Sequence, residues 1–275
     1  MSSCTLKVKK IHPDVSQMRL DFIHFNLGQP NRRTGICEDD IFLLSGGSNS
    51  KNLTICGTND DQHIYFDVDS VEQPITITMN LSDKVISRLW EIRIVQIPFN
   101  DRVPEGCLQY HTGLNGIVKT MNFAENGRHL ANQNYNICLR QEKGTCSVVY
   151  EPCHKNSFKI GPGQNNTSGV NGDAFSDVGS GDGAIATRED DSCNDRVVVP
   201  CPFEDLIMPG NVGVGFCDLS LCGSFSCPSG EADCKVETNV VPFRIGIHFG
   251  PVSREESPED NLGVCLKYEQ QLCTV

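Results

Sequence analysis

The chain has 275 residues with a formal charge of −12, from 23 Lys and Arg against 35 Asp and Glu. Hydrophobic residues make up 38% of it, and 25 Gly and 14 Pro supply many turns, so the composition is that of a globular protein and excludes a disordered chain. The acidic balance argues against nucleic acid and anionic membrane surfaces as partners, and no apolar stretch is long enough to span a bilayer.

Apolar and polar residues alternate through the first hundred residues. This alternation predicts strands at residues 18–22, 63–68, 75–79 and 90–94. Such strands bury one face and leave the other in water, as in antiparallel sandwiches. Aromatic residues on them, such as Phe22, Phe25 and Trp90, are expected in the core. Turn residues separate the strands, and no capped amphipathic run predicts a helix, so we expect an all-β fold.

A second set of strands is predicted after Cys107. Its members are residues 117–123, 135–140, 147–150, 206–208, 240–249 and 264–268. Residues 161–191 are rich in Gly, Asn, Asp and Ser, which predicts a long surface loop where limited proteolysis begins. A polar linker at residues 99–106 contains a proline and separates the two sets. We therefore predict one domain at residues 1–99 and another at residues 100–275.

The 15 cysteines favour disulfides in an oxidising compartment. Structural zinc sites usually contain Cys-x2-Cys pairs, and the chain has none. An odd count leaves one thiol over, and we expect this to be Cys4 because almost no chain precedes it. The start, Met1-Ser2-Ser3, has no apolar signal core. We interpret the chain as an extracellular protein from which the leader and a first cysteine are removed, the alternative being a cytosolic protein.

Four asparagines occupy acceptor triplets for N-linked glycosylation. Asn52 and Asn80 each begin one triplet, and Asn165 and Asn166 begin two that overlap. Such triplets are used in exported proteins, so they agree with an extracellular location.

Several short motifs follow the order seen in CUB domains. Those of the first hundred residues are Met18-Arg19-Leu20-Asp21-Phe22, Cys37-x-x-Asp40-Ile41-Phe42, Ile55-Cys56-Gly57 and Leu81-Ser82-Asp83. The second series comprises Gly106-Cys107-Leu108-Gln109-Tyr110, Ile137-Cys138-Leu139-Arg140, Cys201-Pro202-Phe203-Glu204, Cys222-Gly223 and Val241-Pro242-Phe243-Arg244. The chain thus resembles a tandem CUB-domain secreted protein of the arthropod type. The resemblance implies two CUB-like antiparallel β-sandwich, or jelly-roll, domains.

The resemblance also implies disulfide pairs. By position, Cys37 pairs with Cys56, Cys107 pairs with Cys138, and Cys201 with Cys222 is the family-like pair of the second domain. The sequence leaves open the pairing of Cys146, Cys153, Cys193, Cys217, Cys227, Cys234, Cys265 and Cys273.

Many CUB domains bind calcium, and this resemblance gives the only cofactor expectation. The family's ligands are a Glu, the Asp of the Cys-x-x-Asp motif and the Asp of the Ser-Asp loop; Asp40 and Asp83 match the two aspartates. The Glu position falls at residues 26–28, where no carboxylate is present. Asp40 and Asp83 therefore either hold calcium weakly or accept backbone hydrogen bonds in turns, and we favour the second interpretation.

No catalytic motif emerges from the sequence. There is no Gly-x-Ser-x-Gly elbow, Ser180 only superficially resembles a serine nucleophile, and His63 and His111 lack a matching motif. The resemblance implies a non-catalytic extracellular recognition module that binds a protein or glycan. The alternatives are the regulatory portion of a secreted chymotrypsin-like protease, and a structural component of venom, haemolymph or cuticle. The oligomeric state is left open.

Overall fold

The computed structural model describes most of the chain. The described residues are 2–48, 52–68, 73–125, 127–161, 194–201, 217–225, 235–251 and 257–273. Within them the regular structure is β-strand, apart from two one-turn 3-10 helices, η1 (Phe99–Asp101) and η3 (Pro258–Asp260). The predicted all-β fold is confirmed. The predicted loop at residues 161–191, the strand at 206–208, Ser180, Asn165 and Asn166 lie outside the described residues, apart from Gly161.

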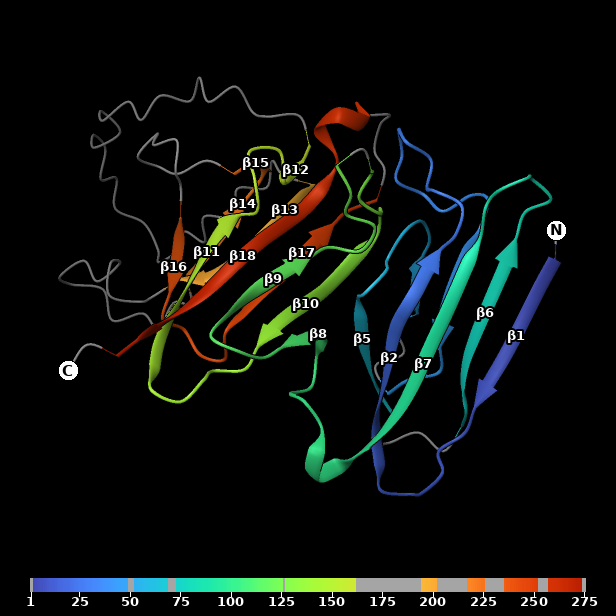
Figure 1. Cartoon of the computed structure of the whole chain (residues 1–275), viewed down its shortest axis with the longest axis horizontal. Helices are drawn as coiled ribbons and strands as arrows, with labels where there is room; N and C mark the ends of the chain where they lie inside the picture. Colours follow the sequence, from blue (N-terminus) through green and yellow to red (C-terminus); the bar gives the residue numbers. More distant parts are fainter. Residues whose placement is uncertain are drawn as a thin grey trace, which may run out of the picture.

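Two sheets make up the amino-terminal half (Figure 1). The strands are β1 (Ser2–Val8), β2 (Val15–Asn26), β3 (Ile41–Ser45), β4 (Leu53–Ile55), β5 (His63–Asp67), β6 (Ile75–Leu81) and β7 (Leu89–Pro98). One sheet has the order β1-β6-β3-β4 and the other has the order β5-β2-β7, with every neighbouring pair antiparallel. The strands predicted at 18–22, 75–79 and 90–94 lie within β2, β6 and β7.

The aromatic core of this half joins its two sheets. Phe22 and Phe25 on β2 and Phe42 on β3 are fully buried, with ring centroids 4.7 to 6.0 Å apart. Trp90 does not join them, because it lies near the start of the edge strand β7 and is 41% exposed. Its predicted place in the core is wrong. An edge strand has a neighbour on one side only, so its large side chains are covered less than those of β2.

Two further sheets make up the carboxy-terminal half. Its strands are β8 (Cys107–His111), β9 (Asn115–Lys119), β10 (Gln133–Leu139), β11 (Thr145–Pro152), β12 (Phe158–Ile160), β13 (Asp195–Cys201), β14 (Cys217–Leu221), β15 (Gly223–Ser224), β16 (Val236–Thr238), β17 (Arg244–Phe249) and β18 (Gly263–Leu272). One sheet has the order β14-β13-β17-β10-β8 and the other the order β15-β12-β18-β11-β16, with β9 also pairing with β18. The pair of β8 and β10 is parallel, which the antiparallel prediction did not include.

Four disulfides join described cysteines: Cys37–Cys56, Cys107–Cys138, Cys146–Cys273 and Cys153–Cys265. The first two are pairs that the resemblance to CUB domains implies. Cys222 is also disulfide-bonded, but the side chain of Cys201 lies outside the described part of the chain, so their pairing stays a prediction. The thiol of Cys4 is free and exposed on β1, as the odd count of cysteines predicts.

Candidate functional site

The first candidate site lies at the end of the amino-terminal sheets where the resemblance implies calcium. β3 pairs with β6 so that Ile41 lies opposite Asn80. This register brings Asp40, which precedes β3, to the same end as Ser82 and Asp83, which follow β6. The side chain of Asp40 is buried, whereas Asp83 is exposed.

Both carboxylate oxygens of Asp40 accept several hydrogen bonds. Oδ2 accepts from the backbone N–H of Gly28 at 2.7 Å and from Nε of Arg88 at 2.7 Å. Oδ1 accepts from the backbone N–H of Ser82 at 3.0 Å and from Nη2 of Arg88 at 2.9 Å. Burial alone would raise the pKa of Asp40, but these hydrogen bonds outweigh burial and lower it to about 2.

This set of groups does not fit a calcium ion. Calcium needs several oxygen ligands, yet both oxygens of Asp40 already face the guanidinium of Arg88. Gly28 occupies the region of the missing Glu, and a Cβ there would lie 3.0 Å from Oδ2 of Asp40. Among the described residues, no cluster of three His, Cys, Asp or Glu side chains could hold a metal. The sequence motif placed Asp40 and Asp83 at one loop end but did not identify Arg88, the residue that contacts Asp40.

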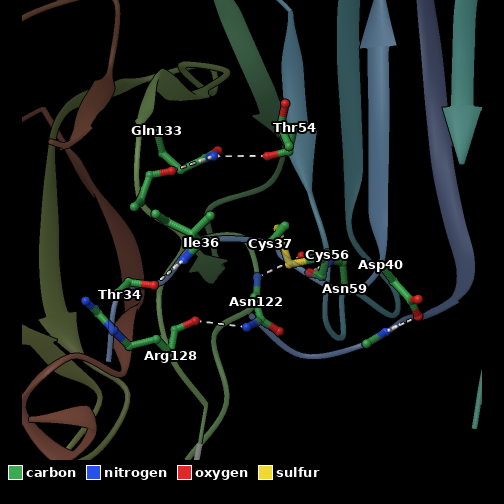
Figure 2. The surroundings of a disulfide bond; sticks show 12 residues. Thr34, Ile36, Cys37, Asp40, Thr54, Cys56, Asn59, Asn122, Arg128 and Gln133 are labelled. Atoms are coloured by element: carbon green, nitrogen blue, oxygen red, sulfur yellow. Dashed lines mark hydrogen bonds between the residues drawn. A yellow bond between two sulfur atoms is a disulfide. The ribbon is translucent and has the colours of Figure 1, made fainter. Parts of the chain in front are cut away.

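A second group of contacts joins the two halves of the molecule. Figure 2 shows Asn122, which follows β9, between Asn59 of the amino-terminal half and Arg128 of its own half. Its backbone N–H donates to Oδ1 of Asn59 at 2.7 Å, and its side-chain Oδ1 accepts from the backbone N–H of Thr58 at 2.8 Å. Its Nδ2 donates to the carbonyl of Arg128 at 2.9 Å. The side chain of Asn122 thus satisfies a polar backbone group in each half. Because Asn122 is buried, water could not replace these hydrogen bonds.

Gly57 makes room for this asparagine. Its φ is +75°, a conformation that favours glycine, and a Cβ at this position would lie 2.0 Å from Oδ1 of Asn122. Farther along the contact, Nε2 of Gln133 donates to the carbonyl of Thr54 at 3.1 Å (Figure 2). At both places a side chain of the carboxy-terminal half therefore lies against the backbone of the amino-terminal half.

The contact continues where β5 meets β8 (Figure 1). Nε2 of His63 lies 2.9 Å from the carbonyl oxygen of Tyr110 and 3.2 Å from its backbone nitrogen. The ring of His63 also lies against that of His111, with 4.9 Å between centroids. The sequence gives neither histidine a matching catalytic motif; in the fold the two rings contact each other, and His63 also contacts the backbone of β8. Sequence reasoning could not bring them together, because they belong to different halves.

The second candidate site is the face of the sheet β5-β2-β7 that carries His63 and Tyr65; its β5 part is buried against β8, and its β7 part is exposed. Strand register places Tyr65, Arg19 and Val95 in one row and Asp21 and Arg93 in the next, and we call these five residues the β2–β7 face. Asp21 accepts hydrogen bonds from Arg19 at 2.6 Å and from Arg93 at 2.8 Å. Burial opposes ionisation of Asp21, but the two arginines outweigh it and lower its pKa. The guanidinium of Arg19 also lies 5.5 Å from the centre of the Tyr65 ring.

The predicted glycosylation acceptors differ in their surroundings. Asn52 is exposed immediately before β4. Asn80, on β6, is half-buried, and its Oδ1 accepts a hydrogen bond from Oγ of Ser3 at 2.8 Å. Glycosylation of these residues stays a prediction.

The carboxy-terminal half coincides with a known family. The sequence-family model described as the animal CUB domain matches residues 104–271, which is more than half of the chain. The chain belongs to the animal CUB domain family. CUB domains are non-catalytic interaction modules, and the disulfides of this chain fit the extracellular location of such domains. Among the described residues, no helix is long and apolar enough to cross a membrane.

Two solved structures of CUB-containing fragments also match. The human "CUB1-EGF-CUB2 domain of HUMAN MASP-1/3" is 15% identical, with a TM-score of 0.30, and the match covers 98% of this chain and 93% of that one. The rat "CUB1-EGF-CUB2 domains of rat MASP-1" are 11% identical, with a TM-score of 0.31, and 98% and 91% covered. No curated protein matches the chain.

Proposed function

We propose that this chain is a non-catalytic recognition unit of a secreted protein, composed of two CUB-like domains in tandem, and that it binds an extracellular protein. Membership of the CUB family supports an interaction role, and the disulfides support export. The tandem arrangement rests on the two pairs of sheets, one on each side of the linker at residues 99–106.

The β2–β7 face is the observation that carries this proposal. Arg93 and Val95 are exposed on it, with a side-chain exposure of 66% for Arg93. The charges are already fixed in place, because Asp21 holds both Arg19 and Arg93 by hydrogen bonds. Arginine is enriched at the energetic centres of protein interfaces, and prior ordering of its side chain lowers the entropic cost of binding.

Apolar groups at the same sheet favour a protein partner over a glycan. Leu89, four positions before Arg93 on β7 and therefore on the same face, is 56% exposed, and Ile23 on the paired strand β2 is 38% exposed. Such side chains add apolar area around the charged row. Protein interfaces likewise combine apolar area with arginine, which is enriched in them.

The test measures binding of the intact chain to a panel of secreted and cell-surface proteins. For the partner found, Val95→Asp and Arg93→Ala should each weaken binding by about tenfold or more. Binding should persist after glycans are removed from the partner enzymatically. Loss of binding on that treatment would show that the ligand is a glycan.

The matched control is Ile117→Asp. Ile117 is also a β-branched residue on a strand, is 49% exposed and lies in the other half, on β9. Its substitution should leave binding unchanged. If Ile117→Asp abolishes binding and Val95→Asp does not, the β2–β7 face is not the recognition surface.

A further inference from the structure

Arg88 connects two loops at the end of the amino-terminal sheets. Its Nε and Nη2 form a two-pronged contact with Asp40, at 2.7 and 2.9 Å. The same Nη2 donates to the carbonyl of Ser82 at 2.9 Å. One guanidinium thus binds the carboxylate before β3 and the backbone after β6. A planar guanidinium suits this task, because its donors match the two oxygens of a carboxylate.

We infer that Arg88 takes the place of a divalent cation at this loop end, so that the loops keep their arrangement without calcium. This inference does not depend on the recognition partner proposed above, and it concerns how the loop end is held together.

The acceptor capacity of Asp40 supports the inference. A carboxylate has about four lone-pair positions. Two backbone N–H groups, from Gly28 and Ser82, and two nitrogens of Arg88 already donate to them. Because the side chain of Asp40 is fully buried, a calcium ion could reach these oxygens only by displacing Arg88.

The acidic residues next to Asp40 also have partners within the protein. Lys84, in the same loop as Arg88, forms an ion pair of 2.8 Å with Asp39. The loop at residues 82–88 therefore supplies one cation to each of two consecutive aspartates. Glu38, the acid before them, accepts hydrogen bonds from Nδ2 of Asn31 at 3.1 Å. The protein itself neutralises or satisfies the acidic segment that an ion would otherwise bind.

Gly28 lies in the region where the family's calcium site has a glutamate, and the space beside it is too small for a glutamate side chain. Its backbone N–H donates directly to Asp40. A Cβ on Gly28 would lie 3.0 Å from Oδ2 of Asp40 and 3.2 Å from Cδ1 of Ile86. A glutamate there would require Asp40 or Ile86 to move.

The experiment titrates calcium into the intact chain by calorimetry and compares thermal unfolding in EDTA with unfolding in about 1 mM calcium, the range of extracellular calcium modules. The wild type should show neither heat of binding nor a change in Tm. Arg88→Ala should lower Tm in EDTA by about 5 °C or more, because it leaves a buried carboxylate without its cation.

Arg93→Ala is the matched control. It also removes a guanidinium bound to a carboxylate, but the side chain of Arg93 is 66% exposed, so the change in Tm should be small. Two results would overturn the inference. One is calcium binding by the wild type that Asp40→Asn or Asp83→Ala abolishes. The other is an Arg88→Ala variant as stable as Arg93→Ala. The wild-type titration decides the first even if Arg88→Ala does not fold.

Discussion

The imidazole rings of His63 and His111 lie against each other across the two halves of the molecule, with 4.9 Å between their centroids and 56° between their planes. His111 contributes a buried Nε2 without a hydrogen-bond partner among the described residues. Arg19, which shares the face of His63, adds a positive charge nearby, and Asp21 opposes it. Protonation of one ring would place its charge near that of Arg19, and protonation of both rings would place like charges in contact at this junction.

Because His63 and His111 are partly buried next to each other, we expect the protein to lose stability in mild acid. Burial, then His63 and Arg19, lower the pKa of His111 to about 4, and burial and Arg19 also lower that of His63. The unfolded state therefore binds protons first, and stability should fall as the pH decreases from about 6.5 towards about 4. Thermal unfolding across this range measures the effect. His111→Phe should flatten the dependence, and His12→Phe, at an exposed position, should not. An equal slope in all three proteins would contradict the prediction.

Asp40 predicts a second loss of stability at lower pH. Its pKa is about 2 in the folded protein against an ordinary value of 3.8. The folded state therefore binds fewer protons, so the stabilisation is complete above about pH 4 and is lost as the pH falls towards 2. Unfolding in urea at pH 4 and at pH 2.5 should show this loss in the wild type. The difference between the two pH values should be smaller in Asp40→Asn, and an unchanged difference would contradict the prediction.

Gly57→Ala should destabilise the junction of the two halves. The substitution combines a positive φ with a Cβ that collides with Oδ1 of Asn122, so we expect a loss of about 2 kcal/mol in the free energy of unfolding. Gly144→Ala separates the two causes, because Gly144 has a φ of +84° but nothing within 4 Å of its Cβ position. Chemical denaturation measures both variants. Equal losses would show that the contact with Asn122 contributes nothing.

The disulfides should contribute unequally to stability. Cys146–Cys273 spans 127 residues and Cys37–Cys56 spans 19. On the chain-entropy model these loops correspond to about 5 and about 3 kcal/mol. Unfolding in urea of the double variants Cys146→Ala/Cys273→Ala and Cys37→Ala/Cys56→Ala compares them. The longer loop should give the larger loss, and the reverse order would mean that folded-state packing around Cys56, which is fully buried, outweighs chain entropy.

Cys4 should react with a thiol reagent in the native protein, because it is free and exposed. Labelling followed by peptide mass analysis identifies the modified residue, and Cys4→Ser provides the control. Labelling of Cys37 or Cys138 in the native, non-reduced chain would contradict the disulfide assignment.

Local patterns predicted several strands but not β1 or β13; they succeed where alternation along the chain reports which face is buried. β2 and β6 were found in this way, and the motifs that contain Asp40 and Asp83 lie at one end of the sheets. The sequence could not predict Arg88 as its partner, since the two meet only when β3 and β6 pair. The missing acid at residues 26–28, together with an arginine soon after Ser82, was the available signal. Trp90 was misplaced because alternation does not distinguish an edge strand from a central one, and the pairing of Cys146 with Cys273 could not be deduced from spacing.

The fit of Gly57 against Asn122 also has an evolutionary consequence. A side chain at position 57 can be accommodated only if position 122 becomes smaller or its loop moves, and Asn122 satisfies backbone groups of both halves at once. Neither position is free to change alone. Among relatives that keep this junction, the two should therefore vary as a pair, although they belong to different halves and lie 65 positions apart in the sequence.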